Sequence, residues 1–205
     1  TFNTAGTYTY YAFARGCNGV TACASIIITV NALNNSAPTG VSATPASPIC
    51  AGSSTSLDAT GGTLGVGATT QWYTGSCGGT LVGTGDPFSF SPAGTTTYYV
   101  RRTGGTGPCP NTTTCTSITI TVQTAVGNNT VSTAQTICSG QTPAGLTGTA
   151  PSGGTGAYTY QWQSSTDGVF YGAAGGTDNT QNYSPGVLTQ TTWFRRNVSS
   201  GACTG

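Results

Sequence analysis

Short runs of alternating apolar and polar residues, separated by turns rich in Gly, Pro and Asn, extend along the whole chain. Alternation with a period of two is typical of strands that bury one face. In the middle of the chain it predicts seven strands, at 40–45, 53–59, 69–74, 80–82, 87–91, 95–103 and 115–122. This number of short strands, with a turn every eight to twelve residues, is typical of a Greek-key sandwich. No segment has a sustained helical period, so we expect an all-β fold.

One segment occurs three times and predicts how the domains are organised. Residues 90–122 are FSPAGTTTYYVRRTGGTGPCPNTTTCTSITITV, and residues 2–30 and 183–205 are related to them. The first two copies end on the same pattern, Cys-x-Ser-Ile-x-Ile-Thr-Val. Self-similarity of this kind indicates repeated domains. We therefore predict the closing hairpin of a preceding domain at 1–32, a complete domain at 38–122, and a domain without its last strand at 130–205.

The charge of the chain excludes several classes of function. Its only basic residues are five Arg and its only acidic residues four Asp, with a formal net charge of +1. Such a chain has no electrostatic footprint for nucleic acid, and its apolar runs are too short for membrane insertion. Without His, Glu or Lys, it lacks most of the usual general acids and bases. The four scattered Asp are typical of turns, so we expect no enzyme, no cofactor and no metal site, a calcium site at Asp167 and Asp178 being the weaker alternative.

Eight Cys, without His and without a Cys-x-x-Cys pattern, indicate disulfides rather than zinc and an oxidising compartment. Strand directions in the sandwich predict Cys50–Cys77 at one end and Cys109–Cys115 beside the last turn, at the other. Cys17–Cys23 repeats the second of these pairs. Elimination leaves Cys138–Cys203, although the strand directions place these two at opposite ends. The alternative is that one of them bonds to a neighbouring domain.

The aromatic residues and the arginines are the candidate contact surface. Trp72 and Trp162 occupy matched positions in the repeats, which predicts core residues. Arginines end the aromatic strand in every copy, and together with a nearby tryptophan they are candidates for contact with an acidic polysaccharide or the next domain: Arg101, Arg102, Arg195, Arg196 and Trp193. The alternative is that charges on an exposed strand keep the sheet soluble and discourage edge pairing.

Several phrases of the sequence resemble a known family. ICAGSST, QWYTGSCGGTLVGTG, TTTYYVRR and the Cys-x-Ser-Ile-Thr-Ile-Thr-Val pattern are similar to the immunoglobulin-like repeats of very large surface proteins from Bacteroidota. ICSG, GAYTYQWQSSTDG and YSPGVLTQTTWFRR resemble a sister repeat of the same proteins. The resemblance implies tandem immunoglobulin-like sandwiches with partial domains at both ends. It also implies type IX secretion, display on the cell surface in gliding adhesins or extracellular fibres, and no catalytic residues.

These observations predict an extracellular stalk or fibre of stacked domains, whose partners are neighbouring domains of the same or identical chains. One alternative is a filament subunit in which residues 1–30 of one chain complete the sheet of another by strand addition. A second alternative is a carbohydrate-binding module of a secreted protein, with surface polysaccharide as its partner.

Overall fold

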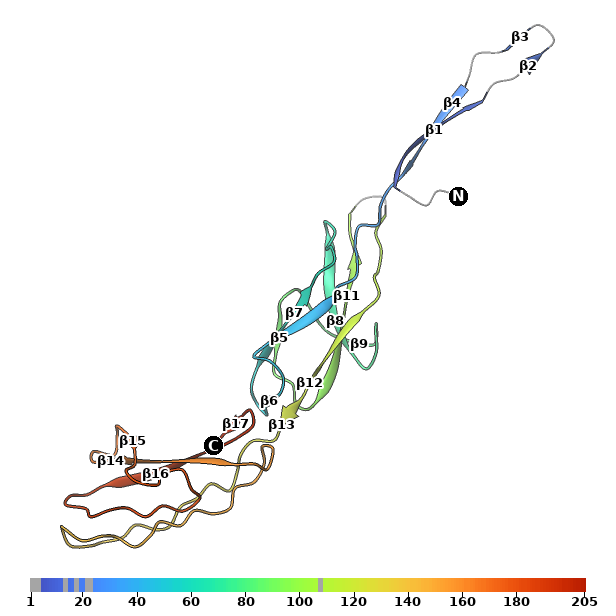
Figure 1. Ribbon diagram of the computed structural model, residues 1–205. Helices are drawn as coiled ribbons and strands as arrows, with labels where there is room; N and C mark the ends of the chain where they lie inside the picture. Colours follow the sequence, from blue (N-terminus) through green and yellow to red (C-terminus); the bar gives the residue numbers. More distant parts are fainter. Residues whose placement is uncertain (1–4, 13–14, 17–18, 21–23, 107–108) are drawn as a thin grey trace. The chain divides into compact units, whose positions relative to one another are not determined.

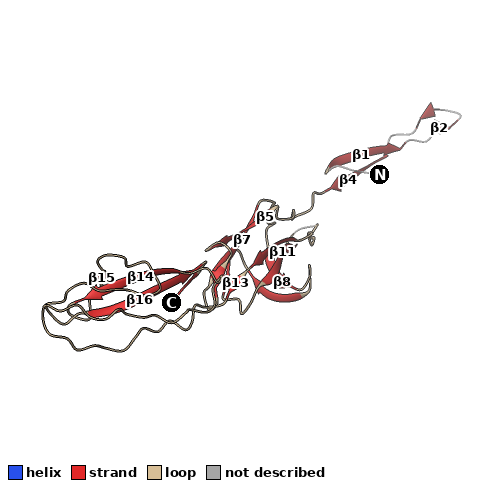
Figure 2. Cartoon of the chain, turned by 60° about the horizontal axis from the view of Figure 1, so that its bottom comes forward, coloured by secondary structure: helices blue, strands red, loops and turns tan. Residues whose placement is uncertain are grey.

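The computed structural model describes the chain apart from residues 1–4, 13–14, 17–18, 21–23 and 107–108. Every regular element of the described residues is a β-strand, drawn in Figure 1 and coloured red in Figure 2. The all-β prediction is therefore confirmed. The strands are β1 (Gly6–Ala12), β2 (Arg15–Gly16), β3 (Gly19–Val20), β4 (Ala24–Val30), β5 (Gly40–Thr44), β6 (Ile49–Cys50), β7 (Thr55–Thr60), β8 (Ala68–Thr74), β9 (Thr80–Thr84), β10 (Phe88–Phe90), β11 (Thr96–Gly104), β12 (Thr116–Ile120), β13 (Val122–Gln123), β14 (Thr159–Ser165), β15 (Gly172–Ala173), β16 (Trp193–Ser200) and β17 (Cys203–Thr204).

The chain divides into two compact units. Unit 1 consists of Thr1–Ser42, Leu57–Phe88 and Tyr98–Ile118, and unit 2 of Ala43–Ser56, Ser89–Thr97 and Thr119–Gly205. The domain boundaries predicted from the repeats, 1–32, 38–122 and 130–205, stay predictions. The described part of the chain holds no helix long and apolar enough to cross a membrane.

Unit 1 begins with an antiparallel hairpin of β1 and β4, with the short pair β2 and β3 between them (Figure 1). Tyr8 lies opposite Ile28 and Tyr10 opposite Ile26. Opposed residues of an antiparallel pair share one face, so this face of the hairpin is apolar and aromatic. Ile26 and Ile28 are nevertheless 61% and 37% exposed.

The strands between β5 and β13 form a three-stranded sheet, in the order β10-β7-β5, and a four-stranded sheet, in the order β12-β11-β8-β9. Alternate residues of β7, β8 and β11 are buried, which places Leu57, Trp72 and Val100 in the core with no exposed surface. The indole Nε1 of Trp72 donates a hydrogen bond to the carbonyl oxygen of Gly85 at 2.8 Å. Its ring stacks on Phe88 with 6.0 Å between centroids. The predicted core position of Trp72 is correct.

One predicted strand is divided in the structure. The expected strand 115–122 is interrupted at Thr121, and its two parts pair with different neighbours. β12 lies beside β11, whereas β13 runs parallel to β6, with Val122 opposite Ile49. The last strand thus closes one sheet and then continues beside β6, a two-residue strand that the sequence pattern did not predict.

Residues 127–205 carry a four-stranded sheet in the order β15-β14-β16-β17. Trp162 on β14 is fully buried, and its Nε1 donates to the carbonyl oxygen of Thr180 at 2.9 Å, as Trp72 does to Gly85. Its ring stacks on Tyr183 at 5.6 Å. Trp162 is therefore a core residue, as its match to Trp72 predicted.

Outside these strands, the described part of residues 127–205 pairs at isolated bridges. Val131 bridges to Gly148, Leu146 to Tyr183, and Gln141 to Leu188. Polar and Gly-rich stretches between the bridges interrupt the alternation that a regular strand requires. One regular sheet and one layer of isolated bridges therefore enclose the core.

Candidate functional site

A disulfide joins Cys50, the last residue of β6, to Cys203, the first residue of β17. The Cα atoms are 4.9 Å apart, within the usual range for a disulfide, and the two residues are separated by 153 positions in sequence. Cys203 has no exposed surface. Both residues belong to unit 2. Because 153 positions separate them in a chain of 205 residues, this bond closes most of the chain into one covalent loop.

The segment that follows β13 is held at successive residues beside this disulfide. Gln123 lies opposite Cys50 in the pairing of β13 with β6. Its side-chain Oε1 accepts the backbone N–H of Ala202 at 2.7 Å. The carbonyl oxygen of Thr124 accepts the N–H of Gly154 at 2.8 Å. The predicted polar linker 123–129 is thus fixed in place, which the sequence did not indicate.

Two glycines are required for this close approach. Gly201 has a positive φ of 61°, and a Cβ atom there would lie 2.5 Å from Oε1 of Gln123. Gly153 also has a positive φ, of 80°, and its Cβ would collide with the carbonyl oxygen of Ala125. L-residues with a side chain rarely adopt this backbone conformation. A larger residue at either position would separate the backbones that the junction brings together.

The predicted pairs Cys50–Cys77 and Cys138–Cys203 are wrong, because Cys50 and Cys203 bond to each other. The strand-direction argument placed Cys50 at a free end of the sandwich. In the structure, the parallel pairing of β6 with β13 places Cys50 beside the segment that leads into residues 127–205. Cys203 bonds instead to Cys50, a residue of the predicted domain 38–122. Cys138 has a free, exposed thiol.

The predicted pair Cys109–Cys115 is also wrong, because Cys115 bonds to Cys77 and Cys109 has a free thiol. The strand directions placed Cys77 at one end of the sandwich, with Cys50, and Cys115 at the other end, beside the last turn. Instead the turn between β8 and β9 folds back over β11, so that a Cβ on Gly78 would lie 2.9 Å from the Arg101 guanidinium. This brings Cys77 to the first residues of the last strand. The predicted pair Cys17–Cys23 lies outside the described residues.

The predicted linker 31–38 is fixed in the same way as 123–129. Asn35 is only 4% exposed, and its side chain donates to the carbonyl oxygens of Gly104 and Asn111 at 2.8 and 2.9 Å. Its backbone N–H donates to Oδ1 of Asn111 at 2.8 Å. The sulfur of Cys109 lies 3.7 Å from the carbonyl oxygen of Asn31. Each of the two linkers therefore lies against the residues that follow it in sequence: 31–38 contacts Gly104 and Asn111, and 123–129 contacts Arg196 and Ala202.

The prediction of a contact surface is wrong for Arg102 and Arg196, which are each only 5% exposed. Successive residues of a strand point to opposite faces, so the second arginine of each pair turns inward. Arg102 donates to the carbonyl oxygen of Ser36 at 3.2 Å, in the first linker. Arg196 donates to Oδ1 of Asn129, in the second linker, and burial lowers the pKa of its guanidinium. Both side chains hold a linker against its sheet.

The first arginine of each pair points outward. The guanidinium of Arg101 lies over the ring of Tyr73, 4.7 Å from its centroid, and that of Arg195 lies over Tyr171 at 4.1 Å. Stacking on an aromatic face is a usual arrangement for an exposed arginine. Trp193 is 44% exposed. A contact surface at Arg101, Arg195 and Trp193 stays a prediction.

Two aspartates near the turns accept hydrogen bonds from neighbouring groups of the fold. Oδ1 of Asp167 accepts the N–H groups of Val169 and Phe170 at 2.8 and 2.9 Å, and these bonds lower the pKa of its carboxyl group. Asp178 accepts a hydrogen bond from the side chain of Gln161 at 2.6 Å. Among the described residues, no three His, Cys, Asp or Glu side chains gather as metal ligands would. We assign these carboxyl groups to turn structure.

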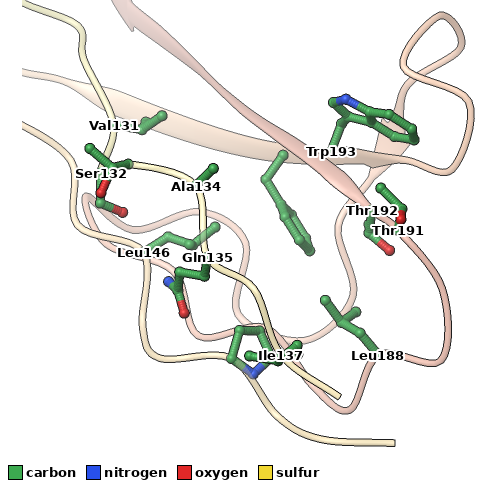
Figure 3. A pocket seen from close by; sticks show the side chains of 13 residues that line it. Val131, Ser132, Ala134, Gln135, Ile137, Leu146, Leu188, Thr191, Thr192 and Trp193 are labelled. Atoms are coloured by element: carbon green, nitrogen blue, oxygen red, sulfur yellow. The ribbon is translucent and has the colours of Figure 1, made fainter. Parts of the chain in front are cut away.

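A groove of about 360 Å³ opens in unit 2 between two walls, shown in Figure 3. Residues 131–137 form one wall, and the segment from Leu188 to the start of β16 forms the other (Figure 3). Its main apolar lining residues are Val131, Ile137, Leu146, Leu188, Trp193 and Phe194. None of the candidate residues drawn from the sequence, apart from Trp193, indicated this groove. The groove lies beside the irregular layer of isolated bridges. That layer has no alternating sequence pattern, so the sequence did not predict it.

Two family models match successive parts of the chain. Residues 36–123 match the family described as "Ig-like domain CHU_C associated". Residues 127–205 match a family described as "Domain of unknown function". No curated protein matches the chain. The first match agrees with the two sheets and the buried Trp72 described above. Residues 36–123 therefore form a β-sandwich that is similar to the immunoglobulin-like domain of this CHU_C-associated family.

Proposed function

We propose that the chain is part of a stalk or fibre of a bacterial cell-surface adhesin, with a mechanical rather than a catalytic role. The immunoglobulin-like domain and the two disulfides are consistent with an extracellular protein. Of the four aspartates, Asp86, Asp167 and Asp178 accept hydrogen bonds within the fold, which supports a structural role. The adhesive partner itself would be recognised elsewhere on such a protein.

The Cys50–Cys203 disulfide is the observation that carries this proposal. When a stalk is pulled from its two ends, tension follows the covalent chain to Cys50 and crosses the disulfide to Cys203. The residues between them lie in a closed loop, so they carry no tension. Both matched domains can therefore lose non-covalent contacts without the chain lengthening through the loop.

The contacts around the disulfide support a stiff junction. A flexible linker would leave its backbone groups to water. Here Gln123 pairs with Cys50 and also accepts the N–H of Ala202, while Asn129 receives two hydrogen bonds from Arg196. A junction with this many fixed groups transmits force between domains rather than absorbing it by bending.

Protease treatment of intact cells that produce the protein tests display and the covalent loop together. We expect peptides of this chain to be released without lysis. Cuts between residues 51 and 202 should leave the flanking fragments joined until a reductant is added. Peptides that appear only after lysis would contradict surface display, and fragments that separate without reductant would contradict the closed loop.

A further inference from the structure

We propose that the sheet of residues 127–205 binds an acidic polysaccharide on its solvent face, with a sugar ring stacked on Trp193 and the sugar carboxylate held by Arg195. This goes beyond the stalk proposal, because it gives the side of the stalk a ligand of its own. The inference rests on β14, β16 and the loop between β14 and β15. It does not depend on the Cys50–Cys203 disulfide, which carries the stalk proposal.

The binding face is defined by the alternation of β16. Trp193 and Arg195 are exposed, whereas Phe194 between them packs against the core. In the pairing with β14, Trp193 lies opposite Ser165 and Arg195 opposite Gln163. Opposed residues of an antiparallel pair share one face, so these four residues form one surface, which we call the outer face.

Trp193 provides a flat apolar surface at one end of the outer face. It is 44% exposed. A Cβ atom on Gly168 would lie 3.4 to 3.7 Å from three atoms of the indole, so the loop after β14 backs the ring. Figure 3 shows Trp193 on the other side of β16 from Leu188, which lines the groove. The face of an aromatic ring carries partial negative charge, and the C–H groups on one face of a pyranose pack well against it.

The loop behind the indole is held in one conformation. The hydroxyl of Ser165, a residue only 5% exposed, accepts the N–H of Gly168 at 2.9 Å and donates to Oδ1 of Asp167 at 2.8 Å. The same carboxyl oxygen accepts the N–H groups of Val169 and Phe170. A surface that is already ordered loses little conformational entropy when it binds a ligand.

Arg195 presents a fixed guanidinium beside this ring. It lies two residues from Trp193 on the same face, about 7 Å along the strand. Its guanidinium stacks on Tyr171, 4.1 Å from the ring centroid, and its Nε donates to Oε1 of Gln163 at 2.7 Å. Among the described residues, its two Nη atoms donate to no other group. A guanidinium with both Nη atoms available binds a carboxylate through two parallel hydrogen bonds.

Arg101 has the same kinds of neighbour in residues 36–123, but its donors are already used. It lies opposite Gln71 and over the ring of Tyr73. Its Nε and Nη2 both donate to the tyrosine hydroxyl, at 3.2 and 2.9 Å. A Cβ on Gly78 would lie 2.9 Å from Nη1, so a turn also covers the group. The anion site is therefore assigned to Arg195.

The chemistry of the outer face identifies the class of ligand. Arg195 forms no ion pair with a carboxylate among the described residues, so an anion from outside completes its hydrogen bonds. Trp193 beside it requires a flat, partly apolar group within a few ångströms of that anion. A sugar ring that carries a carboxylate supplies both groups in one monomer. A neutral sugar lacks the anion, and an acidic peptide lacks the ring.

The test is calorimetric titration of the purified full chain with an oligomer of galacturonic acid. Arg195→Gln should weaken binding at least about tenfold, because it removes the charge-assisted pair. Trp193→Ala should weaken it at least about fivefold through the loss of stacking. Arg101→Gln is the matched control and should leave the affinity unchanged. Circular dichroism confirms that each variant is folded.

Two further probes test the wild-type chain without any substitution. The methyl-esterified oligomer keeps the sugar rings but loses the charge, so it should bind at least about tenfold more weakly. Polyglutamate keeps the charge but has no ring, and it should not compete with the oligomer. Equal binding of either probe would overturn the proposal.

Tryptophan fluorescence locates the bound sugar. Trp72 and Trp162 have no exposed surface, so quenching by acrylamide reports on Trp193, the third tryptophan of the chain. The oligomer should protect Trp193 from quenching. Absence of binding, or an equal loss in Arg101→Gln and Arg195→Gln, would overturn the proposal. Protection caused by concentrating the chain alone would identify a second copy as the occupant and would overturn it too. The stalk proposal stands in each case, because its test depends on the disulfide.

Discussion

Arg196 and Asn129 are joined by two hydrogen bonds, from Nε and Nη2 of the guanidinium to one side-chain oxygen, at 2.9 and 2.8 Å. Arg196 also donates to the carbonyl oxygens of Gln181 and Thr149, at 2.9 and 3.0 Å. One buried cation thus holds three segments of chain together. Since these segments have few backbone ladders, the arginine takes the place of a regular second sheet.

Replacement of Arg196 by Met should destabilise residues 127–205 by about 2–3 kcal/mol, because it removes the hydrogen bonds that a buried guanidinium donates to Asn129, Gln181 and Thr149. Chemical denaturation measures this free energy of unfolding. Arg195→Met is the matched control, since Arg195 is exposed and stacks on Tyr171, and its loss should cost less than about 1 kcal/mol. Equal effects of the two substitutions would contradict the role given to Arg196.

Gly148 tests the same contact from the other side. A Cβ at this position would overlap Nη1 of Arg196 and lie 2.7 Å from the carbonyl oxygen of Gln181. Gly148→Ala should therefore displace the guanidinium and cost about 1–3 kcal/mol of stability in denaturant unfolding. A Cβ at Gly186 would meet no atom within 4 Å, so Gly186→Ala should be neutral within about 0.5 kcal/mol. A tolerated Gly148→Ala would show that Arg196 is not closely packed.

The carboxyl groups of Asp167 and Asp86 should titrate on opposite sides of the ordinary Asp pKa of about 3.9. Backbone N–H groups of Val169 and Phe170 lower the pKa of Asp167. Burial raises the pKa of Asp86, against the hydrogen bond that it accepts from Ala59. NMR titration of the two carboxyl carbons measures both values directly. Two midpoints in the reverse order would contradict these environments.

The two shifts have opposite effects on stability. The folded pKa of Asp167 is depressed, so its stabilisation is present above the unfolded pKa and is lost as the pH falls through the folded value. The folded pKa of Asp86 is raised, so its contribution is present below the unfolded pKa and is lost as the pH rises through the folded value. Asp86→Asn should remove the pH dependence of stability that comes from Asp86 and leave the one that comes from Asp167. Measuring the free energy of unfolding between pH 2 and pH 6 tests this.

The Cys77–Cys115 disulfide should stabilise unit 1. It closes a loop of 38 residues, for which the chain-entropy model gives about 4 kcal/mol. The double substitution Cys77→Ala with Cys115→Ala should lower the free energy of unfolding by up to that amount. Cys138→Ala removes a free, exposed thiol and should change it by less than about 0.5 kcal/mol. An unchanged unfolding midpoint for the double variant would contradict a stabilising role.

The fold could be predicted from the sequence where alternation is regular. Trp72 and Trp162 follow from matched strands, and both are fully buried. The layer opposite β14 and β16 could not be predicted in the same way, because its bridges at Val131 and Leu146 are isolated and the residues around them follow no period. There the side chains of Arg196 and Asn129 supply the order, and a side-chain contact between distant positions leaves no periodic signal.

The cysteine pairing failed for a topological reason. Strand direction places residues at the ends of a sheet, but a turn can fold back over the sheet, as the one holding Cys77 does. Strand direction also cannot show that Cys50 lies beside Gln123, because that contact comes from the two-residue strand β6, which the sequence did not predict. The repeats did contain one signal: Cys109 and Cys203 lie at equal spacing from their double arginines. In the structure, each of these two sulfurs lies beside a linker segment.

The most direct test of the stalk is to pull single oxidised molecules from their two termini. The chain should stop lengthening once tension reaches Cys50 and Cys203, and adding a reductant should then release about 500 Å, from 153 residues at about 3.4 Å each. The double substitution Cys50→Ser with Cys203→Ser should show the added length without reductant. An oxidised wild-type chain that extends as far as this variant would contradict the claim that the disulfide shields the two domains from tension.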